Sequence, residues 1–198
     1  KIKIHALPSV SFKESGDACS GNSLLFTDTS TGADGVLTRE WDFGDNSTYS
    51  GTLASASHTY VTGGDFMVKL TLTTIHGCKE SAIQKVHIAQ LPQASFTHSV
   101  NICENTPVAF KNISTSREGN IVRWLWDFGG AQSSDSDPTY IFPKAGTFSV
   151  SLTVETDNGC RSNVFSKRIK VMSAPQLGFT FSDPICKNGS EVKVKFTN

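Results

Sequence analysis

The sequence has no excess of either charge and no long apolar run. Its 198 residues carry 18 Lys and Arg against 18 Asp and Glu, so the formal net charge is zero. Nucleic-acid binders usually show a strong basic excess or a basic stripe, so this balance argues against a nucleic-acid partner. The longest apolar runs are about five residues, far short of the roughly 20 that a membrane-spanning helix needs. We therefore expect neither nucleic-acid binding nor membrane insertion.

The motifs of common enzymes and metal sites are also missing. The sequence contains no HExxH, GxSxG or GxxxxGK(S/T) pattern. It has five cysteines but no CxxC pair of the kind that zinc sites use. Its five histidines are scattered, and no serine has a recurring His or Asp partner. We predict that the chain is not an enzyme and needs no cofactor.

Helical periodicity is absent as well. No stretch shows the apolar stripe of an amphipathic helix, although apolar residues make up 37% of the chain and suffice for a hydrophobic core. The chain begins at Lys1 and shows no charged-then-apolar leader. We interpret it as an internal piece of a longer protein. The length of the piece suggests one or two domains.

An internal repeat organises the chain. "LPSVSF" at Leu7–Phe12 recurs as "LPQASF" at Leu91–Phe96 and as "APQLGF" at Ala174–Phe179. "EWDFGD" at Glu40–Asp45 recurs as "LWDFGG" at Leu125–Gly130. The other matches, in the same order, are "SHTY" at Ser57–Tyr60 with "DPTY" at Asp137–Tyr140, "GGDFMVKLTLTT" at Gly63–Thr74 with "AGTFSVSLTVET" at Ala145–Thr156, and "HGC" ending at Cys78 with "NGC" ending at Cys160. So many landmarks in one order indicate two complete repeats.

The repeat predicts four segments. Residues 1–7 form the last strand of a preceding repeat, residues 8–90 and 91–173 form two complete domains, and residues 174–198 begin a third repeat. The joint at Pro92 has no Gly/Ser spacer. Such a joint favours a stiff, elongated string of domains.

Each repeat is predicted to be all-β. Phe66, Val68 and Leu70 alternate with less apolar residues, and this period of two marks a half-buried strand. Clusters of Gly, Asn, Asp and Ser separate the strand candidates. About seven short strands in roughly 83 residues are typical of a β-sandwich.

The cysteines are predicted to form one disulfide inside each repeat. Their repeat positions pair Cys19 with Cys78 and Cys103 with Cys160. Cys186 is the equivalent of Cys19 and Cys103, and its partner falls outside the sequence. Paired cysteines indicate an oxidising compartment, so we expect an extracellular or cell-surface location.

Three landmarks together resemble the polycystic-kidney-disease (PKD) domain. They are "WDFGD" at Trp41–Asp45, "HTY" at His58–Tyr60, and the Gly64–Phe66 step before an alternating strand. The second repeat departs from the family pattern because Gly130 replaces the second Asp. The early cysteine and the Gly-Cys hairpin also resemble PKD repeats of secreted and surface proteins of Bacteroidota, including gliding-type adhesins. The resemblance implies seven-stranded, Ig-like sandwiches in tandem, used outside the cell as spacers or interaction modules.

The tryptophan-containing motif is expected to be structural. Its tryptophans are large apolar groups that anchor the core, and its aspartates bond nearby backbone N–H groups. Its glycines permit a sharp turn. The motif residues are Trp41, Asp42, Phe43 and Gly44 in the first repeat and Trp126, Asp127, Phe128 and Gly129 in the second.

Two features leave a ligand open. Trp124 lies two residues before Trp126, where the first repeat has Arg39, so it either extends the core or anchors a sugar or a second chain. We favour the core. The acidic turns at residues 42–46 and 133–137 offer oxygens of the kind that bind calcium, but neither recurs with the same ligands. We favour turn hydrogen bonds there and assign no metal site.

We predict a non-catalytic spacer or stalk of a large repetitive surface or secreted protein, an adhesin that displays functional domains away from the surface. The first partners are neighbouring repeats of the same chain. Two alternatives stay open. One is a carbohydrate- or protein-binding module, with a polysaccharide or a surface protein on Trp124. The other is an accessory domain of a secreted hydrolase.

Overall fold

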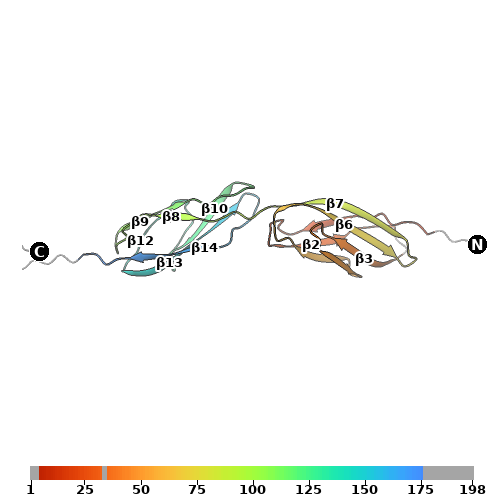
Figure 1. Ribbon diagram of the computed structural model, residues 1–198, viewed down its shortest axis with the longest axis horizontal. Helices are drawn as coiled ribbons and strands as arrows, with labels where there is room; N and C mark the ends of the chain where they lie inside the picture. The colour runs from red at the N-terminus through yellow and green to blue at the C-terminus, as the bar shows by residue number, and fades with distance from the viewer. Residues whose placement is uncertain (1–4, 33–34, 176–198) are drawn as a thin grey trace, which may run out of the picture.

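The computed structural model describes residues 5–32 and 35–175. These residues form two β-sandwiches that lie end to end along the long axis of the molecule (Figure 1). The all-β prediction is confirmed, because every regular element described is a strand. Within the described ranges there is accordingly no helix with the length and apolar character to cross a membrane. The predicted third repeat falls almost wholly outside the described residues.

The first domain contains seven strands in two antiparallel sheets. One sheet has the order β1-β2-β5 and the other β4-β3-β6-β7. The strands are β1 Phe12–Ser15, β2 Ser23–Asp28, β3 Val36–Asp42, β4 Thr48–Gly51, β5 Ser55–Thr59, β6 Gly64–Thr74 and β7 Lys79–Ile88. The predicted seven-stranded sandwich is therefore confirmed for this domain.

The second domain repeats this arrangement. Its sheets have the orders β12-β9-β8 and β11-β10-β13-β14, so each strand has a counterpart in the first domain. The strands are β8 Phe96–His98, β9 Pro107–Asn112, β10 Ile121–Asp127, β11 Gln132–Ser133, β12 Thr139–Ile141, β13 Gly146–Thr156 and β14 Phe165–Val171.

Each core follows from the period-two alternation of the long strands. Val68, Leu70 and Leu72 of β6 face inward and are fully buried, because successive side chains of a strand point to opposite faces of its sheet. Trp41 of β3 pairs in register with Leu70, and Trp126 of β10 holds the same place in the second domain. The two tryptophans are 1% and 0% exposed, so they are the largest buried side chains of the two sandwiches.

The match between β5 and β12 differs by two residues from the match predicted by sequence. In the pairing with the neighbouring strand, His58 corresponds to Tyr140 rather than to Pro138. Tyr60 therefore corresponds to Phe142, not to Tyr140. Both are fully buried, and each packs against the phenylalanine near the start of the next long strand, at ring distances of 4.2 and 4.7 Å. The shared letters "TY" misled the alignment, because the buried aromatic position fixes the register.

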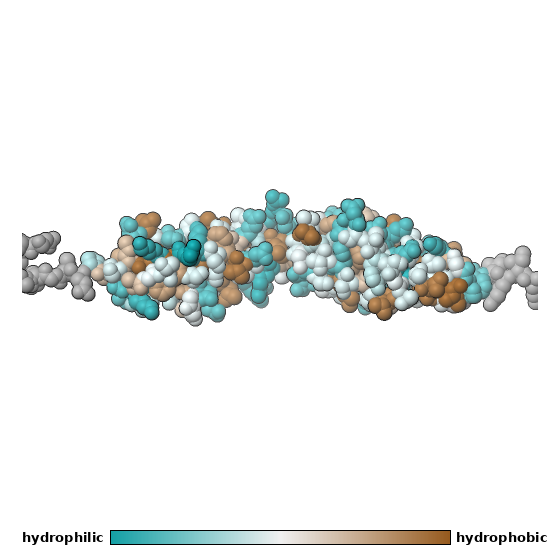
Figure 2. All heavy atoms as spheres, turned by 60° about the horizontal axis from the view of Figure 1, so that its bottom comes forward, coloured by the Kyte–Doolittle hydropathy of each residue, from teal (hydrophilic) through white to brown (hydrophobic). Residues whose placement is uncertain are grey.

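The surface is mixed. On the face drawn in Figure 2, hydrophobic residues form small patches separated by polar ones. Scattered exposed apolar side chains are normal on soluble domains. This face therefore offers no broad apolar surface for docking.

Candidate functional site

The aspartates of the two tryptophan motifs close the turns that follow them. Asp42 Oδ1 accepts a hydrogen bond from the Gly44 N–H at 3.0 Å. Asp127 Oδ1 accepts two, from the N–H groups of Gly129 at 2.8 Å and Gly130 at 2.9 Å. The N–H groups of Gly130 and Gly129 hold the pKa of Asp127 below its usual value. These carboxylates are occupied by their own backbone and shape a turn.

The glycines of the motif differ in how closely the chain approaches them. Gly44 has a φ of +79°, and a Cβ placed there would lie 2.9 Å from the backbone N and O of Met67. Gly129 has a φ of +91°, but the nearest such atom would be 3.9 Å away. Both turns need the left-handed conformation that glycine adopts freely. Only the first turn also needs the missing side chain.

A carboxylate–imidazole pair follows the motif in the first domain. Asp45 Oδ2 lies 2.7 Å from His58 Nε2, and Asp45 Oδ1 accepts the Ser47 N–H at 3.0 Å. Burial raises the pKa of Asp45, but the hydrogen bonds from His58 and Ser47 outweigh it and leave the pKa lowered. The His58 ring stacks on Phe43 at 4.1 Å. The pair therefore fixes the turn against the core aromatics.

The second domain replaces this pair by an aromatic stack. Gly130 stands where the first domain has Asp45, and Tyr140 stands where it has His58. The Tyr140 ring stacks on Phe128 with a centroid distance of 4.4 Å. The same stacking thus occurs with no charged partner, which argues for a structural use of the pair in the first domain.

The other acidic turn also bonds to the protein itself. Asp135 interacts with Ser133, whose hydroxyl lies 3.2 Å from Asp135 Oδ2. Asp137 accepts hydrogen bonds from Lys111 Nζ and from the Asn112 N–H at 2.8 Å. Across residues 5–32 and 35–175, no three His, Cys, Asp or Glu side chains gather as metal ligands.

Trp124 lies against the core of the second domain. It pairs with Val154 across β10 and β13, is partly buried, and packs against the buried cluster around Trp126. Its indole Nε1 is buried and has no hydrogen-bond partner among the described residues. The shallow depression beside it has a volume of about 210 Å³ and includes Arg123 and Glu155. The ring therefore packs against the core and also lines this depression.

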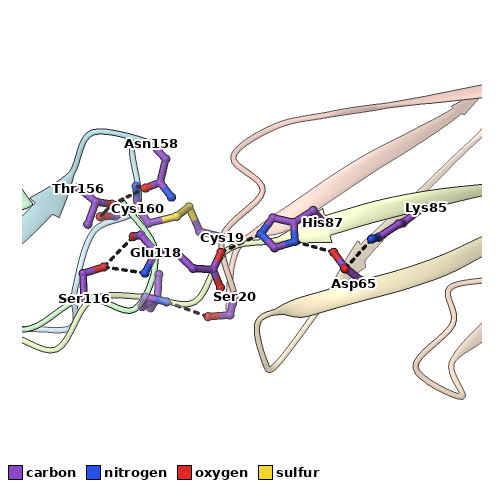
Figure 3. A network of polar contacts seen from close by, with 11 residues as sticks. Cys19, Ser20, Asp65, Lys85, His87, Ser116, Glu118, Thr156, Asn158 and Cys160 are labelled. Carbon is purple, nitrogen blue, oxygen red and sulfur yellow. Dashed lines mark hydrogen bonds and ion pairs between the residues drawn. A yellow bond between two sulfur atoms is a disulfide. The ribbon is translucent and has the colours of Figure 1, made fainter. Parts of the chain in front are cut away.

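A disulfide joins the two domains. Cys19 is bonded to Cys160 across a sequence separation of 141, with the Cα atoms 5.7 Å apart (Figure 3). The predicted pairings Cys19–Cys78 and Cys103–Cys160 are therefore wrong. Within residues 5–32 and 35–175, Cys78 and Cys103 have no disulfide partner, and both are of intermediate exposure.

Strand length explains why the predicted pairs cannot form. Cys19 lies beside Ala89, just after the end of β7, whereas Cys78 directly precedes Lys79, where β7 begins. A strand rises about 3.3 Å per residue, so these cysteines lie at opposite ends of the sandwich, roughly 35 Å apart. A disulfide needs Cα atoms about 4.4–6.8 Å apart. Only a neighbouring domain can bring a second cysteine to Cys19.

A polar network lies beside the disulfide (Figure 3). His87 Nδ1 lies 2.6 Å from Asp65 Oδ1, and His87 Nε2 lies 2.7 Å from Glu118 Oε2 of the second domain. Lys85 Nζ lies 2.7 Å from Asp65 Oδ2. The hydrogen bonds to Asp65 and Glu118 raise the pKa of His87 above its usual value. Protonated His87 therefore bridges a carboxylate of each domain.

The linker between the domains is short and held at both ends. The Ser20 N–H donates to the Ala89 carbonyl at 2.9 Å, and the Gln93 N–H donates to the Thr115 carbonyl at 2.8 Å. Residues 90–92 alone connect these two anchored positions. So short a connection leaves little freedom for one domain to swing against the other.

An apolar cluster fills the space around the linker. Cys19, Ala89 and Cys160 are buried together, with Leu91 packed against them. The Leu91 N–H also lies 3.3 Å from Ser20 Oγ. The junction thus combines a covalent bond, an ion pair and a small buried core.

Sequence reasoning did not identify the polar residues of the junction. Asp65 and His87 are direct partners across β6 and β7, so a strand alignment of the first repeat would have placed them together. Glu118 carries no such signal, because it lies in a loop of the other domain.

Comparison with known proteins identifies the same two repeats. The PKD domain family model matches residues 5–88 and 89–171. The pre-pro-metalloprotease PrtV of Vibrio cholerae is 35% identical over 155 residues, which cover 75% of this chain and 16% of that protein. The collagenase ColA of Clostridium perfringens is 30% identical over 130 residues, which cover 60% of this chain and 12% of that protein. The chain therefore spans less than a fifth of these relatives.

Solved structures of single PKD domains are also similar to parts of the chain. The PKD1 domain of the Vibrio cholerae metalloprotease PrtV is 41% identical, with a TM-score of 0.38, and the match covers 41% of this chain and 98% of that one. The PKD1 domain of Vibrio anguillarum Epp is 32% identical, with a TM-score of 0.40, and the match covers 43% of this chain and 99% of that one. The likeness to adhesins of Bacteroidota remains a prediction. Because the family model matches both repeats over most of their length, the chain belongs to the PKD domain family, as a tandem pair.

Proposed function

We propose that this chain is a non-catalytic, extracellular spacer that belongs to a secreted hydrolase. The disulfide across the domain junction is the observation that carries the proposal. A covalent bond between two domains limits their relative motion, as a spacer of fixed length requires. It also forms and persists in an oxidising environment, which fits a location outside the cell.

The relatives support a hydrolase rather than an adhesin as the parent protein. Their names are those of a metalloprotease and a collagenase. This chain aligns with less than a fifth of each, and we infer that the catalytic part of the parent protein lies outside these two domains. The role proposed for the two domains is to hold that part at a fixed distance from another segment.

The alternative of a binding module has less support. Its candidate anchor, Trp124, is packed against the core of the second domain. Carbohydrate platforms need exposed aromatic faces. The turn carboxylates of both motifs are bonded to their own backbone.

A retention assay on insoluble collagen and insoluble polysaccharides separates the two functions. We expect the oxidised chain and Trp124→Ala to pass through both materials equally. Saturable retention that is lost in Trp124→Ala would replace the spacer by a recognition module.

Small-angle scattering tests the spacer directly. The oxidised chain should scatter as one elongated particle, with a maximum dimension that is unchanged between low and high salt. A compact particle, with the two domains folded against each other, would overturn the proposal.

A further inference from the structure

The early cysteines of the two domains occupy the same structural position. Cys19 forms a parallel bridge with Ala89, and Cys103 forms a parallel bridge with Met172. The residue after each cysteine donates its N–H to the carbonyl of this bridge partner: Ser20 donates to Ala89 and Glu104 to Met172, both at 2.9 Å. Each early cysteine thus lies at the end of its sandwich where the last strand finishes.

The hairpin cysteines match in the same way. Thr74 N–H donates to the Cys78 carbonyl at 2.9 Å, and Thr156 N–H donates to the Cys160 carbonyl at 3.0 Å. The glycines that precede the two cysteines both adopt the left-handed conformation, with φ of +80° and +85°. Each hairpin cysteine lies at the opposite end of its sandwich from the early cysteine.

The outer cysteines differ from the bonded ones in what covers them. Ala89, beside the bonded Cys19, is 7% exposed because the second domain packs over it, whereas its counterpart Met172 is 44% exposed. Cys160 is 1% exposed in the junction, whereas its counterpart Cys78 is only partly buried. The surface around Cys103 is therefore the uncovered copy of the surface that the junction buries.

We propose that the junction disulfide is one step of a ladder, in which the early cysteine of each PKD repeat bonds the Gly-Cys hairpin cysteine of the repeat that follows. Cys103 is then the attachment point for the hairpin of a PKD repeat placed after residue 173 in the same polypeptide. The occupant is specified by this chain, because "APQLGF" at Ala174–Phe179 opens the repeat pattern again. This inference concerns connectivity and goes beyond the proposed spacer function.

The chemistry requires a disulfide oxidant such as oxidised glutathione. The Cys103 thiolate attacks one sulfur of the oxidant and expels one glutathione thiolate, which forms a mixed disulfide. The thiolate of the incoming hairpin cysteine then attacks the Cys103 sulfur and expels the second glutathione. Two protein thiols lose two protons and two electrons, and one oxidised glutathione becomes two reduced ones.

An extended chain tests the ladder. A second copy of residues 91–173 is inserted after Ser173 of the full chain. The copy carries Cys103→Ser, so that it offers only a hairpin cysteine, and Ser149→Thr as a mass label. After oxidative refolding with glutathione, we expect peptide mapping to find Cys103 bonded to the labelled hairpin cysteine, while Cys19 keeps Cys160. Cys103 should then lose its reaction with iodoacetamide.

The matched control is the same extended chain with Cys160→Ser in the inserted copy only. There Cys103 should react with iodoacetamide as it does in the parent chain. A bond between Cys103 and the original Cys160, or a reactive Cys103 in the folded extended chain, would overturn the ladder. If the insert fails to fold, residues 8–90 inserted at the same place supply a second hairpin through Cys78, provided that this copy carries Cys19→Ser and Thr71→Ser as its mass label. The same outcomes then decide, with Cys78→Ser in that copy as the control. The mapping does not depend on shape or ligand binding, so its result is separate from that of the spacer tests.

Discussion

Arg39 and Trp124 occupy the same position in the two domains, one as half of an ion pair and the other as an aromatic ring. Arg39 Nε lies 2.7 Å from Asp28 Oδ2, and the two side chains are 16% and 5% exposed. In the second domain Asn112 takes the place of Asp28. Each side chain accepts a hydrogen bond from the backbone N–H two residues later, Asp28 from Ser30 at 2.9 Å and Asn112 from Ser114 at 3.0 Å. The same position of the sandwich therefore holds a charged side chain, Arg39, in the first domain and an aromatic side chain, Trp124, in the second.

Arg39→Ala should destabilise the first domain by about 3 kcal/mol, because it leaves the buried Asp28 carboxylate without its cation. Urea unfolding combined with amide exchange in each domain measures the loss. Lys13→Ala, at an exposed position of β1, is the control and should change stability by less than about 0.5 kcal/mol. The double variant Arg39→Trp with Asp28→Asn imports the pairing of the second domain and should regain most of the loss.

The first domain should lose stability in acid through Asp28. Burial alone would raise the pKa of Asp28, but hydrogen bonds from Ser30 and Arg39 leave it lowered from 3.8. A lowered pKa in the folded state contributes stability above the unfolded value and loses it as the pH falls through the folded value. The unfolding free energy should therefore decline below roughly pH 5, and Asp28→Asn should flatten that decline. An equally steep profile in Asp28→Asn would contradict the assignment.

The pKa of His87 should lie above its usual value of 6.5, because hydrogen bonds to Asp65 and Glu118 both favour the charged imidazole. The bridge between the domains is then fully formed below pH 6.5 and is lost as the pH rises through the pKa of His87 in the folded protein. An NMR titration of the His87 ring gives the midpoint. Glu118→Gln should lower that midpoint but keep it above 6.5, because Asp65 remains. A midpoint unaffected by this substitution would remove Glu118 from the bridge.

Gly44→Ala should cost more than Gly129→Ala, although the two glycines share one motif. Both substitutions force a side chain into the left-handed region, at about 1 kcal/mol. Only the Cβ at position 44 also meets the backbone of Met67, at 2.9 Å. We expect about 1 kcal/mol for Gly129→Ala and at least about 2 kcal/mol for Gly44→Ala. Equal losses in thermal unfolding would rule out the contact as the cause.

Trp124→Ala should destabilise the second domain by about 2 kcal/mol, less than a fully buried tryptophan would cost. Val122→Ala, whose side chain is 48% exposed on the same strand, is the control and should have little effect. Thermal unfolding compares the two variants. A neutral Trp124→Ala would show that the ring is not part of the core.

The fold was predictable because its signals are local. The alternation in β6 and β13, the turn residues and the repeated tryptophan motif each depend on neighbours in sequence. Seven strands per repeat and the burial of Trp41 and Trp126 follow from these patterns.

The disulfide was not predictable in the same way, because it depends on which end of a sandwich each cysteine reaches. Pairing Cys19 with Cys78 by their repeat positions ignored the ten residues of β7, which separate Cys78 at its start from Cys19 at its end. Counting that strand would have excluded the pair. The Glu118 contact needed the relative placement of two domains, which no local pattern contains.

The bond between Cys19 and Cys160 also decides which part of the chain carries a mechanical load. A pull applied near residue 5 and near residue 175 passes from Cys19 to Cys160 through two sulfur atoms and bypasses the residues between them. At about 3.4 Å per extended residue, the 141-residue separation holds back roughly 480 Å of length. Trp41 and Trp126 lie inside that protected loop, whereas β1 and β14 lie outside it and carry the load directly. The chain around both tryptophans can therefore be extended only after a reductant has opened the bond.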